Sequence, residues 1–330
     1  MELAYAIFIV FVLALLALDL GVFNRRAHAP TLRESLMFTG LWISIGLAFS
    51  VVVYWVYESH VFGLGEHVAQ LGHHEERRVG GGEAVLAYLT GYALEKSLAL
   101  DNLFVMLFVF RALRIEDARQ HRVLFLGILG ALVLRGGMIA IGAVMVARFE
   151  WILYVFGALL VWSGFKLAFG HSDSAEKPKS LVLLERFVRV DGTAKEGWIV
   201  RTPKGLAITT SLLALISIEL ADVVFAIDSI PAIFAVTRDS FIVFTSNVMA
   251  MLGLRSLYFV LAVMADRLVH LGKALAAILV FVGFKMIALY WDLHIPAAFS
   301  LGFIALSMTL GIVFSLRAEK KKAPDEIVVK

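Results

Sequence analysis

The chain has 330 residues, of which 60% are hydrophobic and 17% charged, with a formal net charge of +3 and a mean hydropathy of +0.86. This apolar content is well above that of a soluble globular domain, and it predicts a polytopic membrane protein. No residue is cysteine, which excludes disulfides, thiolate metal sites and thiol redox chemistry within this chain.

Nine stretches of about 20 apolar residues follow one another, and a helix of this length crosses a bilayer. The first stretch lacks the basic start and cleavage site of a signal peptide, so we expect it to remain as a helix. The third, fourth and sixth stretches exceed one crossing, which predicts tilt or interruption. We predict an all-α membrane protein with transmembrane helices near 3–23, 36–57, 84–110, 121–147, 150–170, 205–235, 241–265, 270–290 and 296–316.

Lysine and arginine concentrate in alternate loops, including the long linker 171–204, and in the C-terminal tail. The intervening loops contain mainly Asp and Glu. Because cytoplasmic loops carry the basic excess, we expect an external N-terminus and a cytoplasmic C-terminus in a bacterial-type inner membrane. The basic loops indicate the lipid bilayer as a partner and no nucleic acid, and the oligomeric state is left open.

One acidic motif occurs twice within the apolar stretches. The first copy reads Glu95-Lys-Ser-Leu-Ala-Leu-Asp101-Asn102 and the second reads Asp222-Val-Val-Phe-Ala-Ile-Asp228-Ser229. A charged side chain at the centre of a bilayer costs about 2.5–3.5 kcal/mol even on the insertion scale. Four such carboxylates therefore indicate a function.

The duplication extends beyond this motif. Gly130-Ala-Leu-Val-Leu-Arg135 is matched by Ala250-Met-Leu-Gly-Leu-Arg255, and Gly164-Phe-Lys166 is matched by Gly283-Phe-Lys285. Each repeat would hold three spans, so the second copy enters the membrane from the opposite side, as in many secondary transporters. The predicted organisation is two N-terminal helices with an outer loop (1–83), a first three-helix repeat (84–170), a basic linker (171–204), a second, inverted repeat (205–290) and a last helix with a basic tail (291–330).

These strings, together with Glu219-Leu-Ala-Asp222 and Thr245-Ser-Asn247, resemble the TerC/Alx family of integral membrane proteins over nearly the whole chain, and the Alx branch in particular. The resemblance implies a multispanning helical protein. It also implies links to manganese export, to alkaline-induced expression and, under an older label, to tellurite resistance or membrane-bound redox modulation.

Helix geometry predicts which motif residues lie on the same face of a helix. Positions six apart differ by about 120° around a helix, whereas positions seven apart nearly coincide. Glu95 and Asn102 should therefore share a face, and so should Asp222 and Ser229. Pro231 removes one helical N–H, which predicts a free carbonyl beside Asp228. The first copy has Phe104 at the matching position, so the half-sites should differ.

Carboxylate, amide and hydroxyl oxygens favour hard or borderline cations such as Mn²⁺, Mg²⁺ or Ca²⁺. We predict Asp101 and Asp228 as the main metal ligands, assisted by Asn102 and Ser229, with Glu95 and Asp222 completing the site or carrying protons. Arg135, Arg255, Lys166 and Lys285 would balance charge, and Asn247 and Glu219 would support the site. Alternatively, the acids and bases form a static ion-pair lattice. Asp19 is interpreted as the partner of the nearby Arg25 and Arg26.

The resulting hypothesis is a transporter, not an enzyme, with no tightly bound cofactor. It would export a divalent cation, with protons as a candidate counter-ion, and the resemblance alone selects Mn²⁺ and export. The alternative is a membrane-bound modulator or scaffold linked to alkaline, redox or tellurite stress without transport.

Overall fold

The computed structural model describes residues 1–21, 31–66, 68–69, 76–149, 151–169, 188, 190–191, 197–202, 205–264, 268, 270–291, 293 and 295–322. Most of the predicted linker lies outside these residues. The apolar stretches form helices, because a helix satisfies its backbone hydrogen bonds internally, as a chain in lipid must. They are α1 (Glu2–Gly21), α2 (Leu32–Glu58), α3 (Gly81–Leu113), α4 (Asp117–Arg148), α5 (Ile152–Phe169), α7 (Thr210–Phe234), α8 (Ser240–Met251), α9 (Leu254–Met264), α10 (Leu271–Ala288) and α11 (Ala297–Lys322).

The helices support the predicted all-α polytopic membrane protein. Seven described helices are long and apolar enough to cross a membrane, and the bent pair α8–α9 makes eight when it is counted as one span. α3 is not among these seven helices, and it carries Glu95, Lys96 and Asp101 in its middle. A helix lies at each of the nine predicted positions, while nine crossings stay a prediction.

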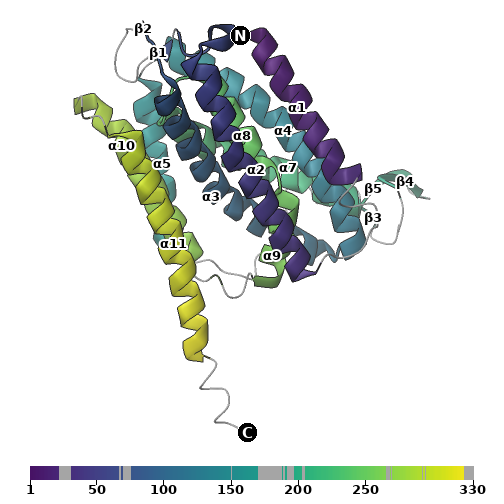
Figure 1. Cartoon of the computed structure of the whole chain (residues 1–330). Coiled ribbons are helices and arrows are strands. Elements are labelled where there is room, and N and C mark those ends of the chain that lie inside the picture. Colours follow the sequence, from purple (N-terminus) through teal and green to yellow (C-terminus); the bar gives the residue numbers. More distant parts are fainter. Residues whose placement is uncertain are drawn as a thin grey trace.

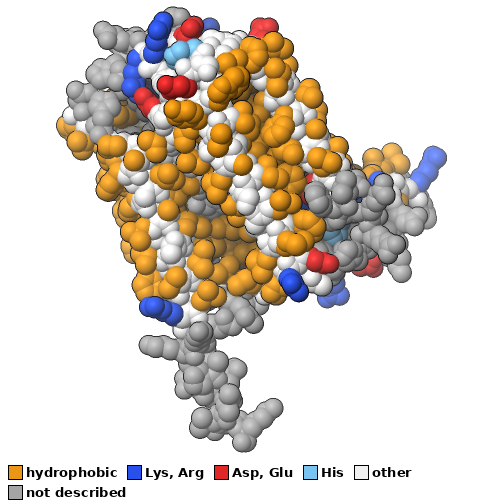
Figure 2. Space-filling view, in the orientation of Figure 1, with side chains coloured by type: hydrophobic (Ala, Val, Ile, Leu, Met, Phe, Trp, Pro, Cys, Tyr) orange, Lys and Arg blue, Asp and Glu red, His pale blue; other side chains and the backbone are white. Residues whose placement is uncertain are grey.

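Hydrophobic side chains cover the middle of the face seen in Figure 2, and charged side chains gather toward its two ends. Several large apolar side chains on this helix bundle are well exposed, such as Val133 at 70% and Trp162 at 63%. Such a surface is unfavourable in water and matches a bilayer, whose hydrocarbon core excludes charge.

The central helices from the two predicted repeats pack against each other (Figure 1). α3 contacts α8 and α7, α4 contacts α7, and α5 lies along α10. Each helix of one half therefore has its main partner in the other half. The inverted relation of the two repeats stays a prediction.

The span predicted at 241–265 is broken. α8 ends at Met251 and α9 begins at Leu254, with a bend of 50° between them. Gly253 has a φ of +77°, a left-handed conformation that favours glycine, and it packs closely on Trp42. In contrast, α3 and α4 run for 33 and 32 residues without a break, so the long spans there are not interrupted.

The start of the span predicted at 205–235 is also corrected. Residues 205–209 form strand β5 (Gly205–Thr209), and helix α7 begins only at Thr210, where the Thr209 hydroxyl accepts a hydrogen bond from the Leu212 N–H. β5 pairs in parallel with β3 (Val190–Asp191) and antiparallel with β4 (Ile199–Thr202). At the other end of the molecule, β1 (Val68–Ala69) pairs with β2 (Glu76–Arg77) near two short 3₁₀ turns, Val61–Gly63 and Leu289–Trp291. The β1–β2 pair and the β3–β5–β4 sheet occupy sequence outside the long helices and leave the bundle helical.

Glycines allow α5 and α10 to approach closely. A Cβ atom at Gly283 would lie 2.6 Å from the carbonyl oxygen of Gly157 and 2.8 Å from the backbone nitrogen of Val161. Both neighbours are backbone atoms, which cannot turn away as a flexible side chain would. Small residues are the usual means of such close packing in membranes.

Gly283→Ala should therefore destabilise the protein by about 1–3 kcal/mol, the usual cost of overpacking. The measurement is thermal unfolding of the purified protein in detergent. Gly272→Ala, in the same helix with open space around its Cα, is the matched control and should leave the melting temperature unchanged or slightly raised. Equal melting temperatures for the two variants would contradict the packing argument.

Candidate functional site

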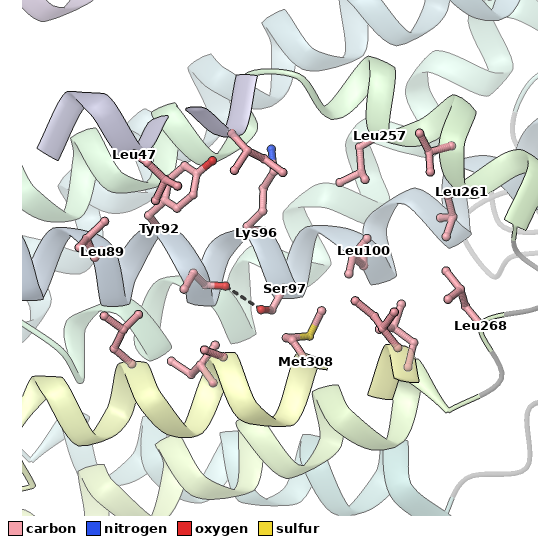
Figure 3. A pocket seen from close by; sticks show the side chains of 18 of the residues that line it. Leu47, Leu89, Tyr92, Lys96, Ser97, Leu100, Leu257, Leu261, Leu268 and Met308 are labelled. Atoms are coloured by element: carbon pink, nitrogen blue, oxygen red, sulfur yellow. Dashed lines mark hydrogen bonds between the residues drawn. The ribbon is translucent and has the colours of Figure 1, made fainter. Parts of the chain in front are cut away.

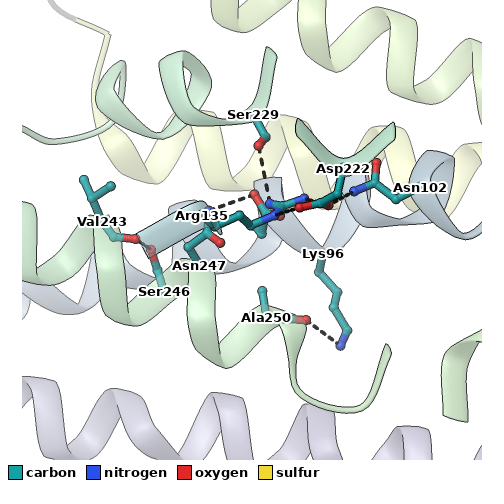
Figure 4. Close-up of polar contacts among 10 residues, drawn as sticks. Lys96, Asn102, Arg135, Asp222, Ser229, Val243, Ser246, Asn247 and Ala250 are labelled. Atoms are coloured by element: carbon teal, nitrogen blue, oxygen red, sulfur yellow. Dashed lines mark hydrogen bonds and ion pairs between the residues drawn. The ribbon is translucent and has the colours of Figure 1, made fainter. Parts of the chain in front are cut away.

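Residues from four helices meet at a buried polar cluster (Figure 4). Glu95 and Asn102 reach it from α3, and Asp222 and Ser229 reach it from α7. Arg135 of α4 lies between the two helices. The two pairs spaced seven residues apart therefore face the same site, as the helix geometry predicts.

Arg135 is the centre of this cluster and is only 2% exposed. Its Nη2 donates to Oδ1 of Asp222 at 2.7 Å and its Nε donates to Oδ2 at 3.1 Å, a bidentate pairing. Its Nη1 forms an ion pair with Glu95 and lies 3.4 Å from the Ser229 hydroxyl oxygen. The planar guanidinium suits this role because its donors are fixed in a fork that matches a carboxylate.

Two carboxamides complete the cluster. Asn102 donates from Nδ2 to Oδ1 of Asp222 at 2.9 Å, and Asn247 of α8 donates from Nδ2 to Oε2 of Glu95 at 3.1 Å. Among the described residues, Oδ1 of Asn247 has no hydrogen-bond partner although it is buried. A buried acceptor without a donor is costly, and it is a free oxygen ligand inside the bundle.

The helix that carries Asn247, α8, begins at a buried N-terminal cap. Asp239 caps this helix, accepting hydrogen bonds from the N–H groups of Phe241 and Ile242 at 2.9 and 3.1 Å. Burial raises the pKa of Asp239 above its ordinary value, and the hydrogen bonds to its carboxylate oppose part of this rise. The cap lies outside the predicted span, two helical turns before the asparagine.

Within the cluster, one guanidinium faces two carboxylates, so the described charges sum to −1 when both acids are ionised. Glu95 is 0% exposed and Asp222 is 3% exposed, which removes water as a source of compensation. Charges buried to this degree need a counter-charge or a proton. Besides Arg135, the two carboxylates can be compensated by a proton or by a further cation.

The predicted main ligands, Asp101 and Asp228, have side chains that lie outside the described part of the structure, so their position in the site stays a prediction. Among the described residues, no group of three His, Asp or Glu side chains is placed to hold a metal ion. α7 continues through Pro231 to Phe234, so the proline does not interrupt the helix. It still supplies no N–H to the helix.

Of the four bases predicted to balance charge, only Arg135 forms an ion pair with a described motif acid. Arg255 pairs instead with Asp19 of α1, with Nη2 and Oδ2 2.8 Å apart. The partners predicted for Asp19, Arg25 and Arg26, lie outside the described residues. The ammonium of Lys285 donates to the Ser300 hydroxyl at 3.1 Å. Lys166 is exposed, with its ammonium 5.0 Å from the centre of the Trp162 ring.

Glu219 lies one helical turn before Asp222 but does not join the hydrogen-bond network. Its carboxyl group packs against α4, where Gly127 and Gly130 leave room for it. Both of its oxygens are buried without a partner among the described groups. Glu219 is therefore a separate carboxyl group beside the cluster, and its burial without a partner among the described groups is costly.

Sequence reasoning missed the role of Lys96, the residue after Glu95. Its ammonium donates to the carbonyl oxygens of Ala250 and Leu252, both at 3.0 Å, where α8 gives way to α9. The last carbonyl oxygens of a helix have no N–H donor within that helix, and here the Lys96 side chain of α3 supplies the hydrogen bonds. The only signal in the sequence was a lysine inside an apolar stretch.

Lys96 also borders a cavity of about 520 Å³ between α3, α9 and α11 (Figure 3). Its other lining residues are almost all apolar, with Ser97 as an exception that donates to Ala93 O at 2.6 Å. A space lined in this way offers no oxygen set for a cation. The acidic cluster is the better candidate site.

Comparisons with known proteins agree with this architecture. A family model described as "Integral membrane protein TerC family" matches residues 80–323. An uncharacterized membrane protein of Myxococcus xanthus is 43% identical over 94% of this chain and 91% of its own length. Alx of Escherichia coli K12, named as a candidate membrane-bound redox modulator, is 44% identical over 90% of this chain and 89% of its own length. Alx of Photorhabdus laumondii is 38% identical over 96% of both chains. No solved structure matches the chain.

Replacing Arg135 with glutamine should destabilise the protein by about 3–5 kcal/mol, because it leaves two buried carboxylates without a counter-charge. The melting temperature in detergent and the yield of monodisperse protein should both fall. Arg148→Gln, an exposed position on the same helix, is the control and should behave as wild type.

Adding Asp222→Asn to Arg135→Gln should recover part of the lost stability, since one unpaired charge is then removed. A double variant as unstable as the sum of both single variants would show that the ion pair does not couple these residues.

Proposed function

Because the chain belongs to the TerC family of integral membrane proteins, we propose that it is a secondary transporter that exports a divalent cation, Mn²⁺, through the cluster around Arg135. The observation that carries this proposal is the excess of buried negative charge in that cluster. A charge imbalance at membrane depth is costly, and intramembrane ionisable groups of this kind commonly serve ion pathways.

Arg135 would act as a tethered cation in the cation-free protein. It compensates Glu95 and Asp222 while no metal is present. A divalent cation that approaches these carboxylates would compete with the guanidinium for the same oxygens. Withdrawal of Arg135 would open the site, and its return would help to release the cation.

The ligands available for a cation would be oxygens. Glu95, Asp222 and the carboxamide oxygen of Asn247 come from the described cluster. Asp101 and Asp228 would add two further carboxylates from the same helices. This set suits Mn²⁺, Mg²⁺ and Ca²⁺, and the choice of Mn²⁺ rests on the family resemblance.

Protons are the proposed counter-ions. A site with several carboxylates holds protons when it lacks metal, because closely spaced or buried acids do not all ionise. Metal binding would then release them. The basic loops predict an external N-terminus and a cytoplasmic C-terminus. In this membrane, export of the metal ion would be coupled to protons that move into the cytoplasm.

The alternative is a redox or stress modulator that does not transport ions, as the names of the Alx relatives suggest for those proteins. A thiol-based mechanism within this chain is excluded by the absence of cysteine. The buried acids from both halves favour the transporter. We propose no enzymatic activity and no resident cofactor.

The test is Mn²⁺ flux into liposomes that contain the purified protein and an internal indicator, measured at two pH gradients. Wild-type flux should be saturable and should change with the pH gradient. Asp228→Asn and Glu95→Gln should each lower the flux at least about tenfold, the effect of losing about 1.4 kcal/mol of interaction. Mg²⁺ and Ca²⁺ as competitors would determine the selectivity.

The control is Glu83→Gln. Glu83 is on the same helix as Glu95, but it is paired with Arg77 at the exposed end of α3. This variant should transport at the wild-type rate. Folded wild-type protein without flux under either gradient would refute the transporter and favour the modulator or scaffold.

A further inference from the structure

A second site is indicated at the opposite edge of the bundle from α1, where α10 and α11 run side by side (Figure 1). A groove of about 800 Å³ follows the seam between the beginning of α10 and the end of α11. One end of this groove is basic, with His270 and Lys273 contributed by α10 and its cap and Arg317 contributed by α11.

The rest of the groove is apolar. Ala274 and Ala277 line it from α10, and Leu310 and Phe314 line it from α11. Leu310 is 42% exposed and Phe314 is 51% exposed. The groove therefore combines two exposed basic side chains at one end with an open apolar surface that begins one turn further along each helix.

The two helices are held together beside this groove, so the groove belongs to the folded protein. A Cβ atom at Gly311 would lie 2.7 Å from the Ala274 Cβ, which shows how closely the backbones approach. The backbone N–H of His270 donates to the Ser315 hydroxyl oxygen at 2.9 Å. These contacts fix the distance between the helices that carry Lys273 and Arg317.

We propose that this groove binds one anionic phospholipid, with its phosphodiester between Lys273 and Arg317 and an acyl chain along Leu310 and Phe314. The charges match an anionic headgroup, and basic pockets between membrane helices are suited to such lipids. Long cationic side chains at helix ends reach headgroup level while their helices remain in the hydrocarbon.

A soluble anion would use only the basic end and leave the apolar part of the groove uncovered. A zwitterionic lipid would cover the apolar part but bring no net negative charge to the two cations. An anionic phospholipid satisfies both parts at once. The site is independent of the proposed cation pathway, because none of these residues belongs to the Arg135 cluster.

Native mass spectrometry of the purified full chain, titrated with phosphatidylglycerol, is the direct test. The wild type should retain one phosphatidylglycerol in preference to phosphatidylcholine with the same acyl chains. Lys273→Gln combined with Arg317→Gln should weaken this binding roughly thirtyfold, since each cation contributes about 1 kcal/mol near an anionic headgroup.

Two controls separate this site from general lipid adhesion. Lys166→Gln removes an exposed cation outside the groove and should leave retention unchanged. Lys273→Arg with Arg317→Lys keeps both charges and should restore binding, which also reports that the positions tolerate substitution. Glycerol 3-phosphate, the headgroup chemistry without acyl chains, should not displace the lipid.

The proposal is overturned by equal retention of the anionic and zwitterionic lipids, or by equal retention in the glutamine double variant and the wild type. Displacement by glycerol 3-phosphate would also overturn it, because the site would then recognise a soluble anion. Each result is independent of whether Mn²⁺ flux is observed.

Discussion

The pairing of Arg135 with Glu95 and Asp222 is the interaction on which the centre of this structure depends. It joins α3 to α7 through α4, and so it connects the two halves of the chain at a position from which water is excluded. Burying three charges is favourable only when each has a partner with good geometry. The carboxamides of Asn102 and Asn247 satisfy further carboxylate oxygens, which brings α8 into the same network. The cluster therefore requires four helices to adopt one arrangement.

Much of this arrangement could be predicted from the sequence, because apolar length and helical periodicity are local properties. The two pairs spaced seven residues apart converge as expected, and Arg135 was recognised as a base that could balance them. The partner of Arg255 could not be predicted in this way. Arg135 and Arg255 occupy matching positions in the repeat pattern, but Arg255 pairs with Asp19 of α1, a helix outside the duplicated segment. Similar sequences thus acquire different partners when an unrelated helix packs against only one of them.

The break between α8 and α9 shows a second limit of sequence reasoning. Glycine is common in membrane helices, so Gly253 alone does not predict a bend. The bend depends on tertiary contacts that hold it, with Trp42 against the glycine and the Lys96 ammonium on the carbonyls of Ala250 and Leu252. Lys96 directly follows Glu95, whose carboxylate accepts a hydrogen bond from Asn247 of α8. One turn of α3 therefore contacts both α8 and the point where that helix ends.

Two features of the described cluster favour the proposed cation site over a static ion-pair lattice. In a static lattice the acids and bases would balance, whereas the described cluster has two acids, one base and a buried amide oxygen without a donor. A bound cation would neutralise the excess negative charge and would also be a partner for the Asn247 Oδ1 atom. Glu219 adds a buried carboxyl group without a partner among the described residues, separated from Asp222 by one helical turn. Structural ion pairing accounts for Arg135 but gives these remaining oxygens no role, whereas the proposed cation pathway would give them one.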